Sequence, residues 1–575
     1  MQLARWVGVL ARGSRVMCSI ALCSTGLWCA AAGAQVPPSV EPGRVEEQRR
    51  PPAEPQRPDS DTVRQPQLEP QRAPANAEDL VFVLQRLTVD GVQAYSADEL
   101  TAPYGALVGQ QISLDRLYQI ANELTARYRN DGYLLSSVVV PAQNIRDGAI
   151  RLQAVEGYLA SVTIEGDVHR RDGLFESLRQ QLLADRPLRT ATLERAVLLM
   201  NDLEGTIAQA ILRPAADAGG ASDLLVKVAT QTVAGTLGAT NRGSEVQGPV
   251  QYEASLELRS ILGLHESTVL SYLQSSDREE LWLGSLTHTQ RLTAGGLDLV
   301  LGGSVSRSDP ELGSELSALN LETDTEQASV QLSYPLMRAR TRNLRARATL
   351  TYHDGLTDSD FGPLSKDVIT AVRAGLSFDS VDAWSGVNLI DIEFSQGVDA
   401  FGSSPAGDPF ASRIGGDPEF SKATLYLARL QSLGEKWSIL LAASGQAAFS
   451  NLLAPEEFAF GGEFYGRAYD PSEVVGDSGL AGKAELRFTH DRPGRFGLTL
   501  YGFYEAGKVW RRLDASEVGA DKEESAASAG GGARFTLGRY ASAYIEAAVP
   551  LNHIVAAEGN DDTRVFGGIQ VGFGN

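Results

Sequence analysis

Cysteine is nearly absent from this sequence and is confined to one end of it. All three cysteines of the 575 residues lie among the first 34: Cys18, Cys23 and Cys29. That stretch has scattered arginines, an apolar run over 16–32 and a small-residue site, Ala32-Gly33-Ala34, a pattern typical of a cleaved export signal. We therefore expect a signal peptide over residues 1–34. Its removal leaves no cysteine, which excludes disulfides and thiol chemistry.

Long apolar runs and excess positive charge are also missing. Beyond residue 34, no apolar stretch reaches the roughly 20 residues that a transmembrane helix needs. The sequence has 72 acidic residues against 51 lysines and arginines, a formal net charge of −21. A phosphate backbone attracts basic surfaces, so this balance disfavours nucleic acid as a partner. The acidic residues are spread along the chain, which is typical of solvated loops.

Patterns for catalysis and for metal binding are scarce as well. The histidines are scattered without metal-ligand spacing: His169, His265, His288, His353, His490 and His553. The stretch Gly476–Ala484 superficially resembles a phosphate-binding loop. However, it has Asp477 where the first glycine must be and Ala484 where serine or threonine must be. We therefore expect no catalytic residue, no metal site and no cofactor.

A proline-rich tract follows the export signal. Residues 35–74 contain two Pro-Pro pairs, at 37–38 and 51–52, and single prolines between and after them. This composition cannot bury a core and predicts an extended linker, which we assign to residues 35–79. A short helix over Val45–Arg50 is compatible with the sequence but is not required by it. Whether the tract plugs the barrel that is predicted below stays open.

A β-α-α-β-β pattern occurs twice after this linker. In the first copy, residues 80–157, a strand over Val81–Val89 precedes helices predicted over Ser96–Tyr104 and Ser113–Asn130. The same order of strands and helices recurs over residues 158–230. A repeated unit of this size predicts two small α/β domains.

Helical patterns stop at residue 231, and about sixteen strand patterns of roughly ten residues fill 231–575. Apolar and polar residues alternate most clearly in four of them: Val250–Leu258, Gln327–Tyr334, Asn343–Tyr352 and Ile390–Ser395. One apolar and one polar face over so many strands, with an export signal, predicts a closed sheet with lipid outside and water inside. The predicted fold class is therefore mainly β, a 16-stranded transmembrane β-barrel after two small α/β domains. Long loops are expected over 449–478 and Asp514–Ala527.

The stretch Gly461–Trp510 has the most informative residues of the predicted barrel. A loop rich in glycine and aromatic residues has Arg467, Ala468 and Tyr469 at its centre, and two strand patterns follow it. The second strand has one carboxylate, Glu505, in an otherwise apolar and glycine-rich run. An unpaired buried charge is costly, so this carboxylate must face water or meet a cation. Arg467 is the nearest candidate.

In this order, the patterns resemble the TpsB transporters, the outer-membrane partners in two-partner secretion. Arg127–Gly157 resembles the first POTRA domain of that family, of the ShlB type, and Leu193–Gly205 resembles the second. The resemblance implies periplasmic POTRA domains and a monomeric barrel in outer-membrane lipid. It also implies export of a large TpsA-like exoprotein, recognised through its N-terminal region. An insertase that builds other barrels is the alternative, and a barrel enzyme such as a lipase is a third class.

The resemblance also assigns roles to two short motifs. The Arg-Gly-Tyr motif of loop six in the family is matched by Arg467, Ala468 and Tyr469, and the inner-wall motif Phe-x-Asp-x-Gly by Phe503, Glu505 and Gly507. It implies that loop six folds into the lumen and that Arg467 docks on Glu505 as a latch. Ala468 replaces the family glycine, which bears on the loop tip because alanine tolerates positive φ poorly. Glu505 replaces an aspartate of the family motif, so the same pairing would involve a side chain that is longer by one methylene group.

Overall fold

The computed structural model describes residues 44, 52–57, 63–64, 71–96, 98–145, 147–166, 173–215, 219–311, 317–492, 496–513 and 521–574. The predicted signal peptide and the helix considered over Val45–Arg50 lie outside the described residues. Among the helices that are described, none is long and apolar enough to span a membrane.

The first small domain packs one helix, α2 (Leu114–Asn130), against a three-stranded sheet in the order β3-β6-β5. The strands of this sheet are β3 (Arg86–Asp90), β5 (Ser137–Val139) and β6 (Ala149–Val155). Two further strands of the domain, β2 (Val81–Val83) and β4 (Gln111–Ser113), pair with each other. The α2 helix begins where the Ser113 hydroxyl accepts a hydrogen bond from the Arg116 N–H at 3.2 Å, a typical N-cap. Its apolar stripe, centred on Leu117 and Leu124, is fully buried.

The helix predicted over Ser96–Tyr104 is wrong. The structure has two 3-10 segments instead, η2 (Asp98–Leu100) and η3 (Gly105–Leu107). Pro103 lies between them and disfavours helical backbone at the residue before it, and so short a helix is marginal in any case.

The second small domain covers one face of its sheet with two helices, α3 (Gly173–Ala184) and α4 (Thr190–Asn201). The sheet order is β1-β8-β9-β7, with β1 (Val63–Arg64), β7 (Tyr158–Gly166), β8 (Thr206–Pro214) and β9 (Ala221–Thr230). β1 comes from the proline-rich tract and pairs in parallel with the outer side of β8. The prediction of a linker without secondary structure therefore missed this short strand.

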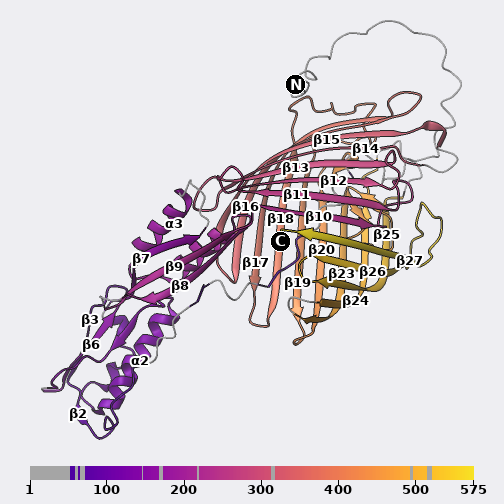
Figure 1. Ribbon diagram of the computed structural model, residues 1–575. Helices are drawn as coiled ribbons and strands as arrows, with labels where there is room; N and C mark the ends of the chain where they lie inside the picture. Colours follow the sequence, from indigo (N-terminus) through magenta and orange to yellow (C-terminus); the bar gives the residue numbers. More distant parts are fainter. Residues whose placement is uncertain are drawn as a thin grey trace.

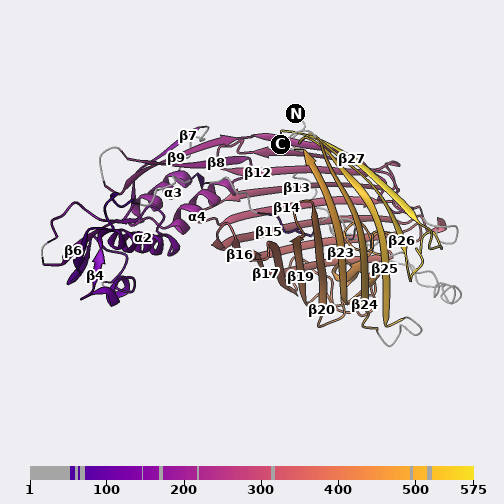
Figure 2. The ribbon, with the colours of Figure 1, turned by 90° about the horizontal axis from the view of Figure 1, so that it is seen from below.

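Sixteen of the remaining strands form one closed antiparallel barrel, in which β10 (Val233–Thr240) also pairs with β27 (Arg564–Phe573). Figures 1 and 2 show the two small domains at one end of it. Sixteen strands close the barrel, as predicted. The other fourteen are β11 (Gln251–Arg259), β12 (Glu266–Ser275), β13 (Leu281–Arg291), β14 (Asp298–Ser308), β15 (Glu322–Arg338), β16 (Arg342–Asp358), β17 (Ser365–Val381), β18 (Gly386–Gly397), β19 (Ser421–Ser432), β20 (Trp437–Ala448), β23 (Ser478–Arg492), β24 (Phe496–Trp510), β25 (Glu523–Leu537) and β26 (Ala541–Pro550).

The alternation read from the sequence corresponds to the two faces of this barrel. On β15, Val330 and Leu332 are each 46% exposed on the outside, whereas Gln331 lines a cavity inside. On the inner face, Arg347 donates a 2.6 Å hydrogen bond to Asp391 of β18. Apolar side chains thus face lipid while ion pairs line the lumen, as expected for strands that cross a membrane.

The long loop predicted over Asp514–Ala527 is too long, because β25 already begins at Glu523 and pairs there with Trp510. The start of this strand is rich in alanine and serine, so its alternation is weak in the sequence. By contrast, the chain between Ala448 and Ser478 is a long connection, as predicted.

The second small domain is attached to the rim of the barrel by charged groups. Arg338 at the end of β15 donates to both carboxylate oxygens of Asp202, at 2.8 and 2.6 Å. Arg291 of β13 donates to the carbonyl oxygen of Leu199 at 3.4 Å and forms an ion pair with Asp298 at 2.5 Å. The C-terminal end of α4 therefore lies directly on this end of the barrel wall.

Candidate functional site in the barrel lumen

Loop six, residues 449–477, folds back into the barrel instead of extending away from it. A short hairpin forms its base, β21 (Phe458–Phe460) paired with β22 (Val474–Gly476). Phe460 is fully buried against the wall strand β24. A Cβ added at Gly507 would lie only 2.2 Å from the Phe460 ring, so glycine is needed there to let the ring approach.

The turn at the tip of this hairpin contains the three predicted loop residues. Positive backbone angles in this turn fall on Gly461, Gly462, Gly466 and Ser472, and not on Ala468. Ala468 is fully buried and packs among Tyr501, Phe503 and other wall residues. The alanine therefore fits without strain, because its own backbone is not in the left-handed region.

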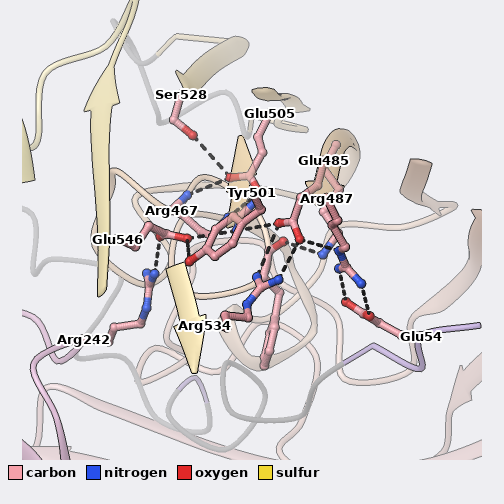
Figure 3. A network of polar contacts seen from close by, with 12 residues as sticks. Glu54, Arg242, Arg467, Glu485, Arg487, Tyr501, Glu505, Ser528, Arg534 and Glu546 are labelled. Carbon is pink, nitrogen blue, oxygen red and sulfur yellow. Dashed lines mark hydrogen bonds and ion pairs between the residues drawn. The ribbon is translucent and has the colours of Figure 1, made fainter. Parts of the chain in front are cut away.

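Arg467 and Glu505 meet in the lumen (Figure 3). The backbone N–H of Arg467 donates to Glu505 Oε2 at 2.9 Å, and its guanidinium Nε donates to Oε1 at 2.8 Å. The guanidinium also lies over the ring of Phe503, 3.5 Å from the ring centroid. Alternate residues of β24, namely Phe503, Glu505 and Gly507, thus form one surface that contacts the loop.

Two further carboxylates, which sequence reasoning missed, complete the surroundings of Arg467. Its Nη1 lies 2.8 Å from Glu485 of β23 and 3.0 Å from Glu546 of β26. The side chains of Glu485, Glu505 and Glu546 are at most 1% exposed. Glu546 resembles Glu505 in being a single carboxylate in an apolar strand, so the pattern that singled out Glu505 would also have found it.

The other two carboxylates also have cations of their own. Glu485 pairs with Arg487 at 2.7 Å and with Arg534 at 2.8 Å. Glu546 pairs with Arg242 and accepts a hydrogen bond from the Tyr501 hydroxyl at 2.9 Å. Within the described part of the chain, Arg467 is the one cation in an ion pair with Glu505, while Lys483 lies opposite Glu505 on β23. The other side-chain partner of Glu505 is the Ser528 hydroxyl at 3.3 Å. Glu505 therefore depends on Arg467 more than its neighbours do.

The residues after Arg467 attach the turn to other strands of the wall. The hydroxyl of Tyr469 donates to the carbonyl oxygen of Ala527 at 2.8 Å. Asp470 pairs with Arg564 of β27 at 2.7 Å, and Arg564 also donates to the carbonyl oxygen of Ala468 at 3.2 Å. The loop tip thus contacts the wall from β23 to β27.

The N-terminal tract contacts the same lumen. Arg44 is buried and pairs with Glu457 of loop six at 2.8 Å. Further along the tract, Glu54 pairs with Arg487 of β23 at 3.1 Å. Glu54 and Arg57 line a lumen cavity of about 830 Å³, together with Arg242, Arg467, Arg534 and other wall residues. Arg44 and residues 54–57 of the tract therefore occupy part of the barrel lumen.

This arrangement is suited to holding and releasing a polypeptide segment. Every functional group described around Arg467 is a carboxylate, a guanidinium, a hydroxyl or an aromatic ring. Among the described residues there is no group of three or more potential metal ligands. The loop is thus held to the wall by noncovalent contacts, mainly ion pairs and hydrogen bonds.

A closed sixteen-stranded barrel with two small α/β domains and a loop in its lumen is a POTRA-barrel protein of the outer membrane. The family model described as haemolysin secretion/activation protein ShlB/FhaC/HecB matches residues 220–535, and the model of the ShlB-type POTRA domain matches residues 82–157. The first match covers more than half of the chain, so the chain belongs to this family. Its members are TpsB transporters, which export partner exoproteins across the outer membrane and have their POTRA domains in the periplasm. The resemblance stated from the sequence is confirmed.

Individual relatives are distant in sequence but similar over most of their length. The heme/hemopexin transporter protein HuxB of Haemophilus influenzae is 23% identical over 466 residues, 76% of this chain and 78% of that protein. The outer membrane transporter CdiB of Dickeya dadantii is 21% identical over 429 residues, 72% of this chain and 75% of CdiB. The structure of CdiB from Escherichia coli has 19% identity and a TM-score of 0.72, covering 88% of this chain and 92% of CdiB.

Proposed function

We propose that this transporter exports one large exoprotein, which it recognises in the periplasm through the N-terminal region of that exoprotein. In this proposal, Arg467 is a latch that holds loop six in the lumen until the exoprotein enters. The barrel works as a monomer and without a catalytic residue. The observation that supports this best is the position of Arg467, on a loop that enters the lumen and among three buried wall carboxylates.

A latch made of ion pairs can be both strong and reversible. Removing one partner from a buried pair costs about 3–5 kcal/mol, because the other charge stays buried without compensation. Opening is different, since water reaches both charges as the loop leaves the wall. The loop is therefore stable while closed and still able to leave. The neighbouring carboxylates Glu485 and Glu546 keep cations of their own when Arg467 leaves.

We further propose that the small domains bind the exoprotein by strand addition. An unfolded polypeptide can extend a sheet at an exposed edge, because backbone hydrogen bonds need no particular sequence. Both small domains have short sheets with edge strands. The second domain contacts the barrel rim through the ion pair between its Asp202 and Arg338 of the barrel. A chain captured there is close to the pore entrance. Folding of the exoprotein outside the cell then favours outward movement.

Deleting the second small domain, residues 158–230, tests this proposal. We expect the barrel to insert while the exoprotein disappears from the medium, because the docking edge is lost. Barrel assembly is checked by heat-modifiable migration in gels, and secretion is measured as exoprotein in the medium per assembled barrel. Deleting the first small domain, residues 80–157, is the matched comparison for loss of periplasmic mass. Normal secretion by the barrel that lacks 158–230 would contradict docking there.

A further inference from the structure

The N-terminal tract adds a strand to the second small domain. β1 pairs in parallel with β8, with Val63 opposite Ala210 and Arg64 opposite Ile211. β8 would otherwise be the outer strand on this side of the sheet. It is the one place among the described residues where the tract pairs with a sheet. The edge of β8 therefore accepts an extended polypeptide in this structure.

The two edges of this sheet differ in how well they can accept a longer strand. β8 has nine residues, and the described residues of the tract pair with only two of them, Ala210 and Ile211. Ile207, on the part of β8 that no described residue of the tract pairs with, is 52% exposed. On the opposite edge, β7 has an irregular register between Leu159 and Ser161. Such irregularities protect an edge from pairing, whereas a regular edge with an exposed apolar side chain promotes it.

We infer that β8 is the edge on which the exoprotein docks in extended form, and that the transporter's own β1 occupies this edge until the exoprotein displaces it. This inference rests on the proposed function and identifies its docking strand. A tethered strand competes at millimolar effective concentration, but β1 offers only two residue pairs. An exoprotein strand can start on residues Thr206 to Gln209, with which no described residue of the tract pairs, and then extend over the whole edge. The partner chemistry is an extended, unfolded polypeptide.

Displacement of β1 also affects the lumen, because β1 and Glu54, which lines the lumen cavity, belong to one tract. Glu54 lies nine residues before Val63, so a chain of at most about 32 Å joins them. Glu54 pairs with Arg487, and Arg487 pairs with Glu485, one of the three carboxylates around Arg467. While β1 is docked, the tract is held at both ends. When β1 is released, the tract is no longer held at the small domain, and its withdrawal from the lumen would leave Arg487 paired with Glu485.

A disulfide lock tests the competition in the natural host. The probe is the exoprotein that disappears from the medium when this chain is deleted. The double variant Arg64→Cys with Ile211→Cys joins positions that are opposite each other on β1 and β8. The matched control, Glu165→Cys with Lys227→Cys, joins β7 to β9, which stay paired in any case. A photo-crosslinking amino acid at Gln209, exposed on β8, reports contact with the exoprotein in both backgrounds.

With the β1–β8 lock closed, we expect both secretion and exoprotein crosslinking at Gln209 to fall at least tenfold and to return when reductant is added. The β7–β9 lock should change neither. Val63→Pro, which weakens β1 pairing, should raise crosslinking at Gln209. Undiminished crosslinking at Gln209 with the lock closed would overturn the inference, even if secretion stopped. Crosslinking through Thr163 on β7 in place of Gln209 would overturn it too. If deletion of the chain removed no exoprotein from the medium, the proposed function itself would fail.

Discussion

The substitution Arg467→Ala tests the latch most sharply. It leaves Glu505 buried with the Ser528 hydroxyl as its remaining side-chain partner among the described residues. Loss of one partner of a buried ion pair costs about 3–5 kcal/mol. About 3 kcal/mol is enough to change the ratio of closed to open loop roughly 150-fold. We expect secretion to fall to less than a tenth, while the barrel still assembles because its strand pairing is unchanged.

The partner substitution Glu505→Ala should do less harm. Arg467 then keeps Glu485 at 2.8 Å and Glu546 at 3.0 Å, so its charge remains compensated. The loss is that of the two hydrogen bonds to Glu505, for which we estimate about 1–3 kcal/mol in total. The double variant should cost less than the sum of the two single variants, by about 0.5–3 kcal/mol, because residues in contact do not contribute additively.

The assay measures exoprotein in the medium per assembled barrel, together with the melting temperature of the purified barrel. Arg347→Ala is the control, since it removes an arginine that pairs with Asp391 and Glu393 on the inner wall outside loop six. The control should lower the melting temperature and leave secretion intact. Strictly additive effects at Arg467 and Glu505, or an equal loss of secretion in the control, would refute the latch.

Three further outcomes are expected. Ala468→Gly should lower the melting temperature and not improve secretion, because this residue is buried without positive φ and the substitution only removes a packed methyl group. Leu332→Arg should destabilise the barrel by about 2–4 kcal/mol if it lies near the midplane, whereas Gln331→Arg should be tolerated; equal losses would refute the assignment of faces. His553 lies 3.7 Å from Glu473 of loop six, and its interaction with this carboxylate raises the pKa of His553 above its ordinary value of 6.5. Its pairing should therefore stabilise the loop fully below pH 6.5 and be lost as pH rises through the raised pKa. A barrel melting temperature that falls over this range in the native protein and not in His553→Gln would support this contribution.

The sequence was most informative where one simple periodicity repeats. Alternation in stretches such as Gln327–Tyr334 gave the barrel and its two faces, because a strand that separates lipid from water must alternate. Alternation fails to locate the start of β25 at Glu523, because the alanine- and serine-rich residues there do not alternate clearly between apolar and polar. The limits of such patterns are also clear at Ser96–Tyr104, where a short helical pattern with Pro103 forms only 3-10 turns. A weak local preference in a short segment is readily overridden by its surroundings.

The site was predictable only in part, for a physical reason. Arg467 and Glu505 could be linked because the same loop-strand stretch contains both, whereas Glu546 comes from β26, two strands beyond β24 and 79 residues away from Arg467. Pairing across such a distance depends on the order and register of the strands in the barrel, which no local pattern specifies. The same holds for Glu54, which reaches Arg487 across 433 residues of sequence. A proline-rich tract has no periodicity from which its contacts in the lumen could be inferred.

The most direct test of the account compares the native host with a strain that lacks this chain. Export of a dedicated partner predicts that one large exoprotein disappears from the medium and returns when the chain is supplied again. The amounts of other outer-membrane barrels should stay unchanged. A general loss of outer-membrane barrels, with no exoprotein specifically missing from the medium, would indicate an insertase and would contradict the exporter.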